Sequence, residues 1–218
     1  MKNPWTELPE QPPYVLPPDR EKLERHNASS PPGARFETRA LPFPFMGKTD
    51  APVVLLHLNP GLAKADLSQQ ETDAFRTRYR ANLGHADLAH PCFLLDPALR
   101  AHPGHSYWRK HLSSMLEALG TAKLSRGLLI LEWFPYASES APARFPRLES
   151  QNYSFDLLRR SIAGKAVVIV LRARQRWEEA VPELLGYNSR FELNSPQAAS
   201  VSPKNCPQGY DAALRRLA

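Results

Sequence analysis

The triplet Asn59-Pro60-Gly61 combines residue types that readily suggest chemistry. The Asn59 carboxamide carries an acceptor oxygen and two N–H donors, so its oxygen can hold a water molecule against an electrophilic carbon. An amide cannot deprotonate that water, which suits reactions in which the leaving group does most of the bond breaking. Pro60 stiffens the turn, and Gly61 lets a ligand approach the backbone closely. Taken alone, the triplet is an ordinary turn at the end of a strand, and the rest of the chain has to decide between the two.

Apolar runs predict the strands that must position this triplet. Residues 51–58, 127–133 and 165–171 are nearly continuous in apolar and β-branched side chains, which is typical of buried strands in a parallel sheet. Residues 190–193 predict a shorter fourth strand. Asn59-Pro60-Gly61 directly follows the first run, so we expect it at the carboxyl end of that strand.

Helical patterns lie between these runs. Ser68 with Glu71 predicts a capped helix start before Phe75, and Ser106 predicts the cap of a helix that Gly120 ends. Further helices are expected near residues 155–163 and 175–185, the second disturbed by Pro182, and at the C-terminus. Strands that alternate with helices predict an α/β domain with helices on both faces of a parallel sheet. Ligands of such sheets bind at the carboxyl ends of the strands, which places four polar residues on one rim: Asn59, Glu132, Arg172 and Asn194.

The first 45 residues contain ten of the 22 prolines, so they cannot form regular helix or central strand throughout. A short helix at residues 19–26 is expected within an otherwise extended arm. Aromatic side chains need burial, so we expect the arm to pack on the domain formed by residues 46–218 through Trp5, Tyr14, Phe36 and Phe43.

Composition limits the remaining possibilities. The 218 residues suffice for one domain, and the net charge of +6 would attract polyanions such as nucleic acid. No apolar run is long enough to span a bilayer and the N-terminus lacks the apolar core of a signal peptide, so we expect a cytoplasmic, monomeric protein. Cys92 and Cys206 are too few for a disulfide framework. Five histidines between residues 85 and 111 follow no zinc-binding pattern, so we expect neither a metal nor a cofactor.

Three segments resemble motifs of the uracil-DNA glycosylase superfamily. Residues 58–62, L-N-P-G-L, resemble the G-I-N-P-G-L motif of its mismatch-specific uracil/thymine branch. Residues 102–108, H-P-G-H-S-Y-W, are similar to that branch's H-P-x-N-x-F-W segment at the start of a helix. Residues 193–200, L-N-S-P-Q-A-A-S, are similar to its second motif, N-P-S-G-L-S, or to H-P-S-P in other branches. The order and the strand contexts agree over about residues 50–218.

The resemblance implies a three-layer α/β/α sandwich, with a central four-stranded parallel sheet, that holds a base flipped out of DNA. It implies a DNA repair hydrolase in which Asn59 positions water at the sugar C1′, with Gly61 and Leu62 beside the base. Candidates to stack on the base are Phe134, Tyr136, Phe43 and Phe45. Single- or double-stranded DNA would meet the second motif and nearby polar residues, namely Asn194, Ser195, Ser200, Lys204, His105 and Arg172.

Glu132 departs from the family pattern. The segment Glu132-Trp133-Phe134-Pro135-Tyr136 resembles the N-Y-C-P-L of the single-strand-selective branch, in which the asparagine reads uracil. An ionised Glu132 only accepts hydrogen bonds, so it would repel O4 of uracil and favour an exocyclic amine, as in cytosine or adenine. Uracil is therefore not the base that this residue favours. The alternative is that Glu132 pairs with an arginine such as Arg172.

Two other departures support a second hypothesis. The stretch of residues 63–101 is longer than the usual connection and carries Arg76, Arg78 and Arg80, so a lid over the pocket is one structure it could form. Ser195 and Pro196 are swapped relative to the family's second motif. The second hypothesis is a catalytically inactive member of the fold that binds nucleic acid or a nucleotide.

Overall fold

The computed structural model describes residues 1–142, 145 and 147–218. A five-stranded sheet in the order β1-β3-β2-β4-β5 forms its centre. The strands β3, β2, β4 and β5 are parallel to one another, whereas β1 runs antiparallel to β3. Their bounds are β1 Phe45–Gly47, β2 Val53–His57, β3 Leu128–Glu132, β4 Val167–Val170 and β5 Arg190–Glu192.

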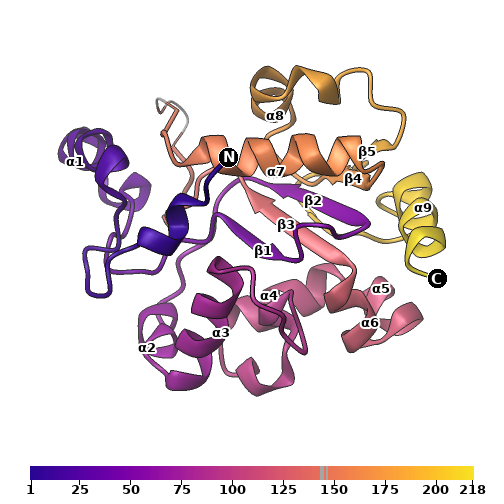
Figure 1. Ribbon diagram of the computed structural model, residues 1–218, viewed down its shortest axis with the longest axis horizontal. Coiled ribbons are helices and arrows are strands. Elements are labelled where there is room, and N and C mark those ends of the chain that lie inside the picture. The colour runs from indigo at the N-terminus through magenta and orange to yellow at the C-terminus, as the bar shows by residue number, and fades with distance from the viewer. Residues whose placement is uncertain (143–144, 146) are drawn as a thin grey trace.

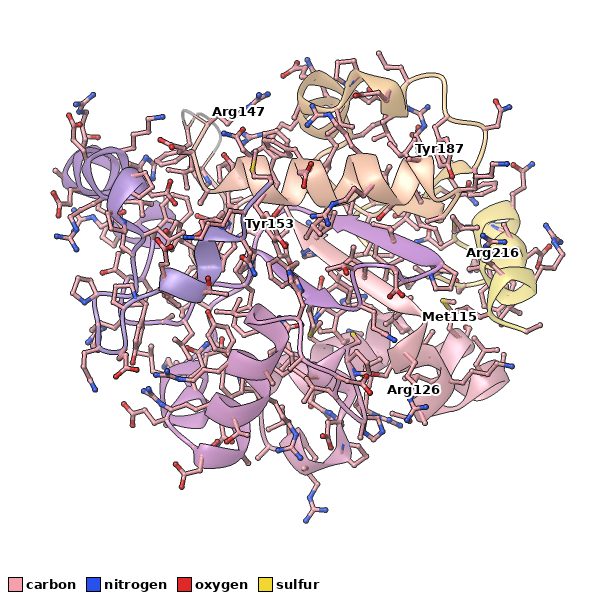
Figure 2. The ribbon with its side chains drawn as sticks, viewed as in Figure 1. Met115, Arg126, Arg147, Tyr153, Tyr187 and Arg216 are labelled. Atoms are coloured by element: carbon pink, nitrogen blue, oxygen red, sulfur yellow. The ribbon has the colours of Figure 1, made fainter. Side chains whose placement is uncertain are left out.

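Helices cover both faces of this sheet. In Figure 1, α7 and α8 lie over one face, and α3 to α6 lie over the other. Helix α9 contacts β4, β5 and α5. Side chains on opposite sides can be followed in Figure 2, with Met115 and Arg126 on one side and Tyr187 on the other. The helices are α1 Arg20–Ser29, α2 Asp66–Gln70, α3 Asp73–Leu83, α4 Pro103–His111, α5 Ser113–Leu119, α6 Thr121–Arg126, α7 Gln151–Ala163, α8 Arg174–Ala180 and α9 Pro207–Leu217.

The three long apolar runs form the centre of the sheet. Residues 53–56 of β2 and most of β3 and β4 are fully buried, as expected for strands covered by helices on both faces. Their register pairs His57 at the end of β2 with Glu132 at the end of β3. The carboxyl ends of the two strands therefore present polar side chains next to each other.

The predicted α/β class is confirmed, but the sheet is mixed and has a fifth strand. Residues 45–47, at the end of the proline-rich arm, pair antiparallel with residues 129–131 and form β1. Gly47 has φ +113°, and a Cβ there would lie 2.0 Å from the backbone oxygen of Leu128. A glycine is therefore required where the arm turns away from β3. The short strand and its flanking prolines gave no alternating pattern from which pairing could be predicted.

Two predicted helix starts are wrong by one turn or more. Ser68 lies inside α2, and the cap of α3 is Thr72, whose hydroxyl accepts from the Phe75 N–H. Helix α4 begins at Pro103, capped by the His102 ring, and not at Ser106. Proline is favoured in the first helical turn because its missing N–H would lack an intrahelical partner there, and this outweighed the serine.

The N-terminal arm packs into the same core as the strands. Trp5, Tyr14 and Phe36 are each less than 5% exposed, and the arm contains the short helix α1. Asp19 is fully buried and accepts hydrogen bonds from the Tyr136 hydroxyl and the Ser150 N–H. Since these partners follow β3 and precede α7, the arm is tied to the segment that leaves the carboxyl end of β3.

Candidate functional site

A cavity of about 500 Å³ opens at the carboxyl ends of β2 and β3. This volume lies within the range of small-molecule sites. Its apolar lining includes Phe43, Phe45, Leu62, Leu94 and Trp108. Its polar lining comprises His57, Asn59, Asp66, Gln70, His102, Tyr107, Glu132, Glu139 and Arg172.

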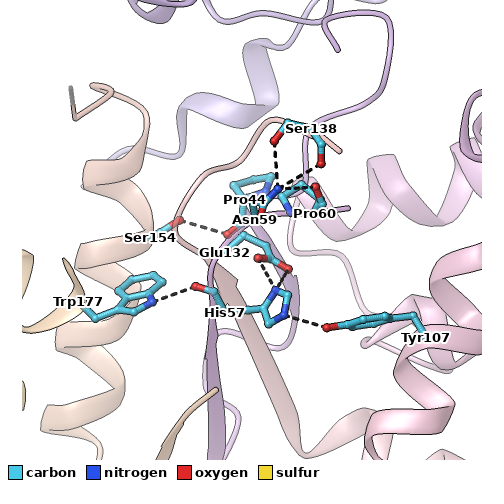
Figure 3. Close-up of polar contacts among 9 residues, drawn as sticks. All are labelled: Pro44, His57, Asn59, Pro60, Tyr107, Glu132, Ser138, Ser154 and Trp177. Atoms are coloured by element: carbon cyan, nitrogen blue, oxygen red, sulfur yellow. Dashed lines mark hydrogen bonds and ion pairs between the residues drawn. The ribbon is translucent and has the colours of Figure 1, made fainter. Parts of the chain in front are cut away.

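Asn59 lies in this lining with its amide nitrogen fixed. The nitrogen donates to the Pro60 oxygen at 3.1 Å, to Ser138 Oγ at 3.2 Å and to the Ser138 oxygen at 3.4 Å (Figure 3). Two of these three acceptors are carbonyl oxygens, which cannot donate, so they determine which end of the amide faces them. Within the described part of the chain, Asn59 Oδ1 has no hydrogen-bond donor. The oxygen that could hold a water molecule is thus available.

Glu132 and His57 form a buried pair in the same cavity. Nδ1 of His57 lies 2.9 and 3.1 Å from the two carboxylate oxygens, and both side chains are less than 10% exposed. Because a carboxylate only accepts, Nδ1 carries the proton. Glu132 is therefore paired with this histidine, whereas an arginine partner such as Arg172 was the alternative considered from sequence.

Tyr107 extends this pair into a chain of three side chains. Its hydroxyl lies 2.9 Å from His57 Nε2 (Figure 3). When the imidazole carries its one proton on Nδ1, Nε2 accepts the tyrosine O–H. Burial, with the nearby Glu132 charge, raises the pKa of Tyr107 to about 12, so the phenol keeps its proton at neutral pH. The arrangement can move a proton between the cavity and Glu132.

His102 lies on the wall of the cavity that α4 contributes. Its Nδ1 accepts the Gly104 N–H at 2.9 Å, which caps the helix and leaves the ring proton on Nε2. Nε2 is buried and has no hydrogen-bond partner among the described residues; the nearest carboxylate oxygen, Asp66 Oδ1, is 3.8 Å away. Burial lowers the pKa of His102 to about 4, and His105 nearby adds to the effect. His102 is therefore neutral at pH 7.

The stability of the protein should fall between about pH 6.5 and pH 4 because of His102. In the unfolded chain His102 has its usual pKa of 6.5, so its imidazole binds a proton as the pH falls below that value. In the folded protein the same imidazole stays neutral until the pH reaches about 4. The shift corresponds to about 3 kcal/mol of unfolding free energy lost over this interval. Urea denaturation at several pH values measures it, and His102→Gln should flatten the profile. An equally steep profile in that variant would contradict this role of His102.

The candidate base-contacting residues fall into two groups. Gly61, Leu62 and Glu132 line the cavity with Asn59, as do the alternative aromatics Phe43 and Phe45. Phe134 and Tyr136 lie outside it and are fully buried. The Phe134 ring packs against Phe36, and Tyr136 contacts the arm through Asp19 and the Leu16 N–H. Their place after β3 suggested a stacking role, but the chain turns there toward the arm.

The candidate DNA-contacting residues are also divided. Arg172 lines the cavity, and it donates to the Gln197 oxygen at 3.2 Å, which brings the exposed residues 195–198 to the rim. Asn194 does not line the cavity, and its amide donates to the Lys204 oxygen. The Asn205 side chain bonds Ser195 and Ser200 and closes this loop. His105 lies outside the cavity and is buried, with Nδ1 bonded to the Leu94 oxygen.

The segment considered as a lid packs against the rest of the domain and contributes to one wall of the cavity. Its helices α2 and α3 contact each other, and α3 also contacts β1. Arg76 donates to the Tyr14 hydroxyl, Arg78 pairs with Asp96, and Arg80 pairs with Glu10. The polar residues of this wall that line the cavity are Asp66 and Gln70. These two residues could not be singled out from their spacing, because a polar pair four residues apart is normally part of a solvated helix face.

Comparison with known proteins identifies no relative of this chain. No protein-family model matches the chain, and neither a curated protein nor a solved structure matches it. Within residues 1–142, 145 and 147–218, no helix has the length and apolar character needed to cross a membrane. The same residues contain no group of three or more histidine, cysteine or acidic side chains arranged to hold a metal ion.

Proposed function

We propose that this protein is a uracil-DNA glycosylase-like enzyme that hydrolyses the N-glycosidic bond of a base flipped out of DNA. The observation that carries the proposal is the orientation of Asn59, whose amide nitrogen is held by Pro60 and Ser138 so that Oδ1 is left for a water molecule. The four parallel strands, with helices on both sides and a cavity at their carboxyl ends, also support it. The resemblance of residues 58–62, 102–108 and 193–200 to glycosylase motifs adds the reaction class.

In the proposed reaction, the bond between the sugar C1′ and the base nitrogen breaks, and its electron pair leaves on the base. The oxygen of the water on Asn59 adds to C1′. One proton of this water is released and the departing base takes up one proton, so the products are a free base and an abasic sugar. The released proton can enter the chain formed by Tyr107, His57 and Glu132. Negative charge on Glu132 favours the cationic sugar of the transition state.

Glu132 therefore orients His57 in this proposal, and it does not read the base. The single N–H of His57 Nδ1 lies between its two oxygens, at 2.9 and 3.1 Å, and holds the carboxylate against the imidazole. The preference for an exocyclic amine, expected from an unpaired carboxylate, loses its basis. Base recognition then falls to other polar residues of the cavity.

Arg172 is the candidate contact to a phosphate next to the flipped nucleotide. It lies at the cavity rim, its Nε is buried, and within the described residues this nitrogen has no hydrogen-bond partner. A guanidinium binds phosphate through several donors at once. The exposed residues 195–198 lie beside it, and the net charge of +6 favours approach of DNA.

The direct test is base release from single- and double-stranded oligonucleotides that each carry uracil, hypoxanthine, xanthine or an alkylated base. We expect release of at least one base, and a fall of about 100-fold or more in rate for Asn59→Ala, comparable with removal of one preorganised transition-state contact. Leu67→Ala, a change in the half-buried part of α2 that does not line the cavity, serves as the matched control with an unchanged rate.

Absence of release from every substrate would contradict the enzymatic proposal. Binding separates this outcome from the alternative of an inactive DNA-binding protein. If labelled DNA binds with an affinity that falls steeply with salt and does not depend on Asn59, the inactive form of the fold is supported.

A further inference from the structure

We propose that Asp66, Gln70 and His102 form a recognition subsite for a lactam, the carbonyl next to a ring N–H that occurs in several nucleobases. The inference deepens the proposed function and rests on it for the identity of the ligand as a nucleobase. The three side chains line the cavity described above, and each is about 4–6% exposed.

His102 contributes one hydrogen-bond donor. Since Nδ1 accepts the Gly104 N–H, the neutral ring carries its proton on Nε2, which faces no acceptor within hydrogen-bond distance in the described residues. The ring stacks on Phe75 with centroids 4.8 Å apart and an angle of 12° between the planes. The hydrogen bond from the Gly104 N–H and the stacking on Phe75 therefore fix the orientation of the His102 ring and of its Nε2–H donor. A buried N–H without a partner is costly, so a ligand acceptor in the cavity would relieve it.

Asp66 contributes an acceptor beside this donor. Its Oδ2 accepts the Ala63 N–H at 2.6 Å, and its Oδ1 lies 3.8 Å from His102 Nε2. That separation is too long for a direct hydrogen bond, but adjacent groups of one small ligand can reach both atoms. The site thus offers an acceptor and a donor side by side.

Gln70 contributes a second donor. Its Oε1 accepts the Leu41 N–H at 2.7 Å, which assigns the carbonyl end of the amide to the backbone and leaves the NH₂ group without an acceptor in the described part of the chain. Asp66 and Gln70 lie four residues apart on α2, so their side chains share one face of that helix. The subsite therefore carries two donors and one acceptor.

A lactam matches these two donors and one acceptor better than an amidine does, the amidine being an amino group next to a ring nitrogen. Its ring N–H can donate to Asp66, and its carbonyl oxygen has two lone pairs, so it can accept from both His102 and Gln70. Adenine and cytosine present an amino group and a ring nitrogen, which has a single lone pair and satisfies only one of the two donors. An amidine thus leaves one buried donor unpaired, which lowers affinity by about tenfold or more.

The test measures binding of free bases to the intact protein at pH 7.5, by titration calorimetry. Hypoxanthine and adenine have the same ring system and differ at this edge, as do 1-methyluracil and 1-methylcytosine, in which the methyl group replaces the N1–H that free cytosine would present beside its C2 carbonyl. We expect the lactam of each pair to bind at least about tenfold more tightly than its amidine counterpart. Equal affinities within both pairs, or no measurable binding of any of the four bases, would overturn the inference. This comparison uses the wild-type protein and does not depend on a variant that folds.

Asp66→Asn provides the matched variant. The Ala63 N–H requires an oxygen, so the new amide would turn its NH₂ group toward His102 and the ligand, where it would oppose the lactam N–H. We expect the preference for hypoxanthine over adenine to disappear, with a melting temperature that verifies folding. An unchanged preference in a folded Asp66→Asn protein contradicts the subsite.

Asn59→Ala separates this inference from the proposed function. The variant should keep the preference among free bases while it loses base release. Lactam preference without release from any oligonucleotide would support the subsite and reject the glycosylase proposal. Base release without a preference for lactams would support the glycosylase proposal and reject the subsite.

Discussion

Trp177→Ala is expected to lower the free energy of unfolding by about 3–5 kcal/mol, the range for removal of a large aromatic side chain from a packed core. Trp177 is fully buried in α8. Its ring packs edge-to-face against Trp133 and Phe155, with ring centroids 5.2 and 5.9 Å apart. These neighbours come from the end of β3 and from α7, so the alanine variant leaves a cavity between three elements. For a domain of this size the melting temperature should fall by roughly 10 °C, measured by calorimetry or circular dichroism.

Trp177→Phe is the matched control for this change. The indole N–H donates to the His57 oxygen at 3.0 Å (Figure 3). The same oxygen accepts the Trp133 backbone N–H at 3.3 Å. Phenylalanine keeps an aromatic ring, but it lacks the N–H and is smaller than the indole. We therefore expect a loss of about 1–3 kcal/mol, part from the first hydrogen bond and part from the removed volume. If both variants lose equal stability, the hydrogen bond to His57 dominates and packing does not. If neither loses any, the packing interpretation is wrong.

The sequence was sufficient to predict the centre of the fold and insufficient for its edges. The runs that became β2, β3 and β4 are long and apolar. The helix expected over about residues 175–185, kinked or shifted by Pro182, is instead α8, which ends at Ala180 and is followed by a short 3-10 turn that starts at Pro182. Helix α6 was not predicted, since six residues after Gly120 contain too few apolar positions for a period to be recognised. The helix expected up to Gly120 is also divided at Leu112, where φ is −112°. Such breaks depend on tertiary packing, which local propensity does not contain.

The candidate site shows the same division. Asn59 and Glu132 could be selected because each ends a predicted strand, and parallel strands bring their carboxyl ends together. His57 was missed, although it is the one polar residue of the apolar run 51–58 and pairs with Glu132 in the strand register. His102 and Asp66 come from separate helices whose approach no local pattern encodes. A sequence can thus place residues on a rim, but the partners of a buried carboxylate follow only from the packed structure.

The pairing of His57 with Glu132 is the contact on which the chemistry of the cavity most depends. We expect His57→Leu to reduce the free energy of unfolding by about 3–5 kcal/mol, since it leaves the Glu132 carboxylate buried without its partner. Glu132→Leu removes the acceptor of the Nδ1 proton and should cost about 1–3 kcal/mol. The double variant contains neither polar group, so its loss should be smaller than the sum of the two single losses by about 2 kcal/mol or more.

Urea denaturation of the four proteins gives this coupling directly, and the exposed pair Arg159–Glu183 provides the control. The two atoms of that pair are 3.1 Å apart, as close as in the buried pair, but the side chains are 43% and 52% exposed, so solvent screening should leave no resolvable coupling. The comparison therefore varies burial at nearly constant distance. A coupling between His57 and Glu132 as small as that of the surface pair would mean that the carboxylate does not hold the imidazole. In that event Glu132 would be free to face a ligand, and the relay from Tyr107 through His57 would have no fixed end.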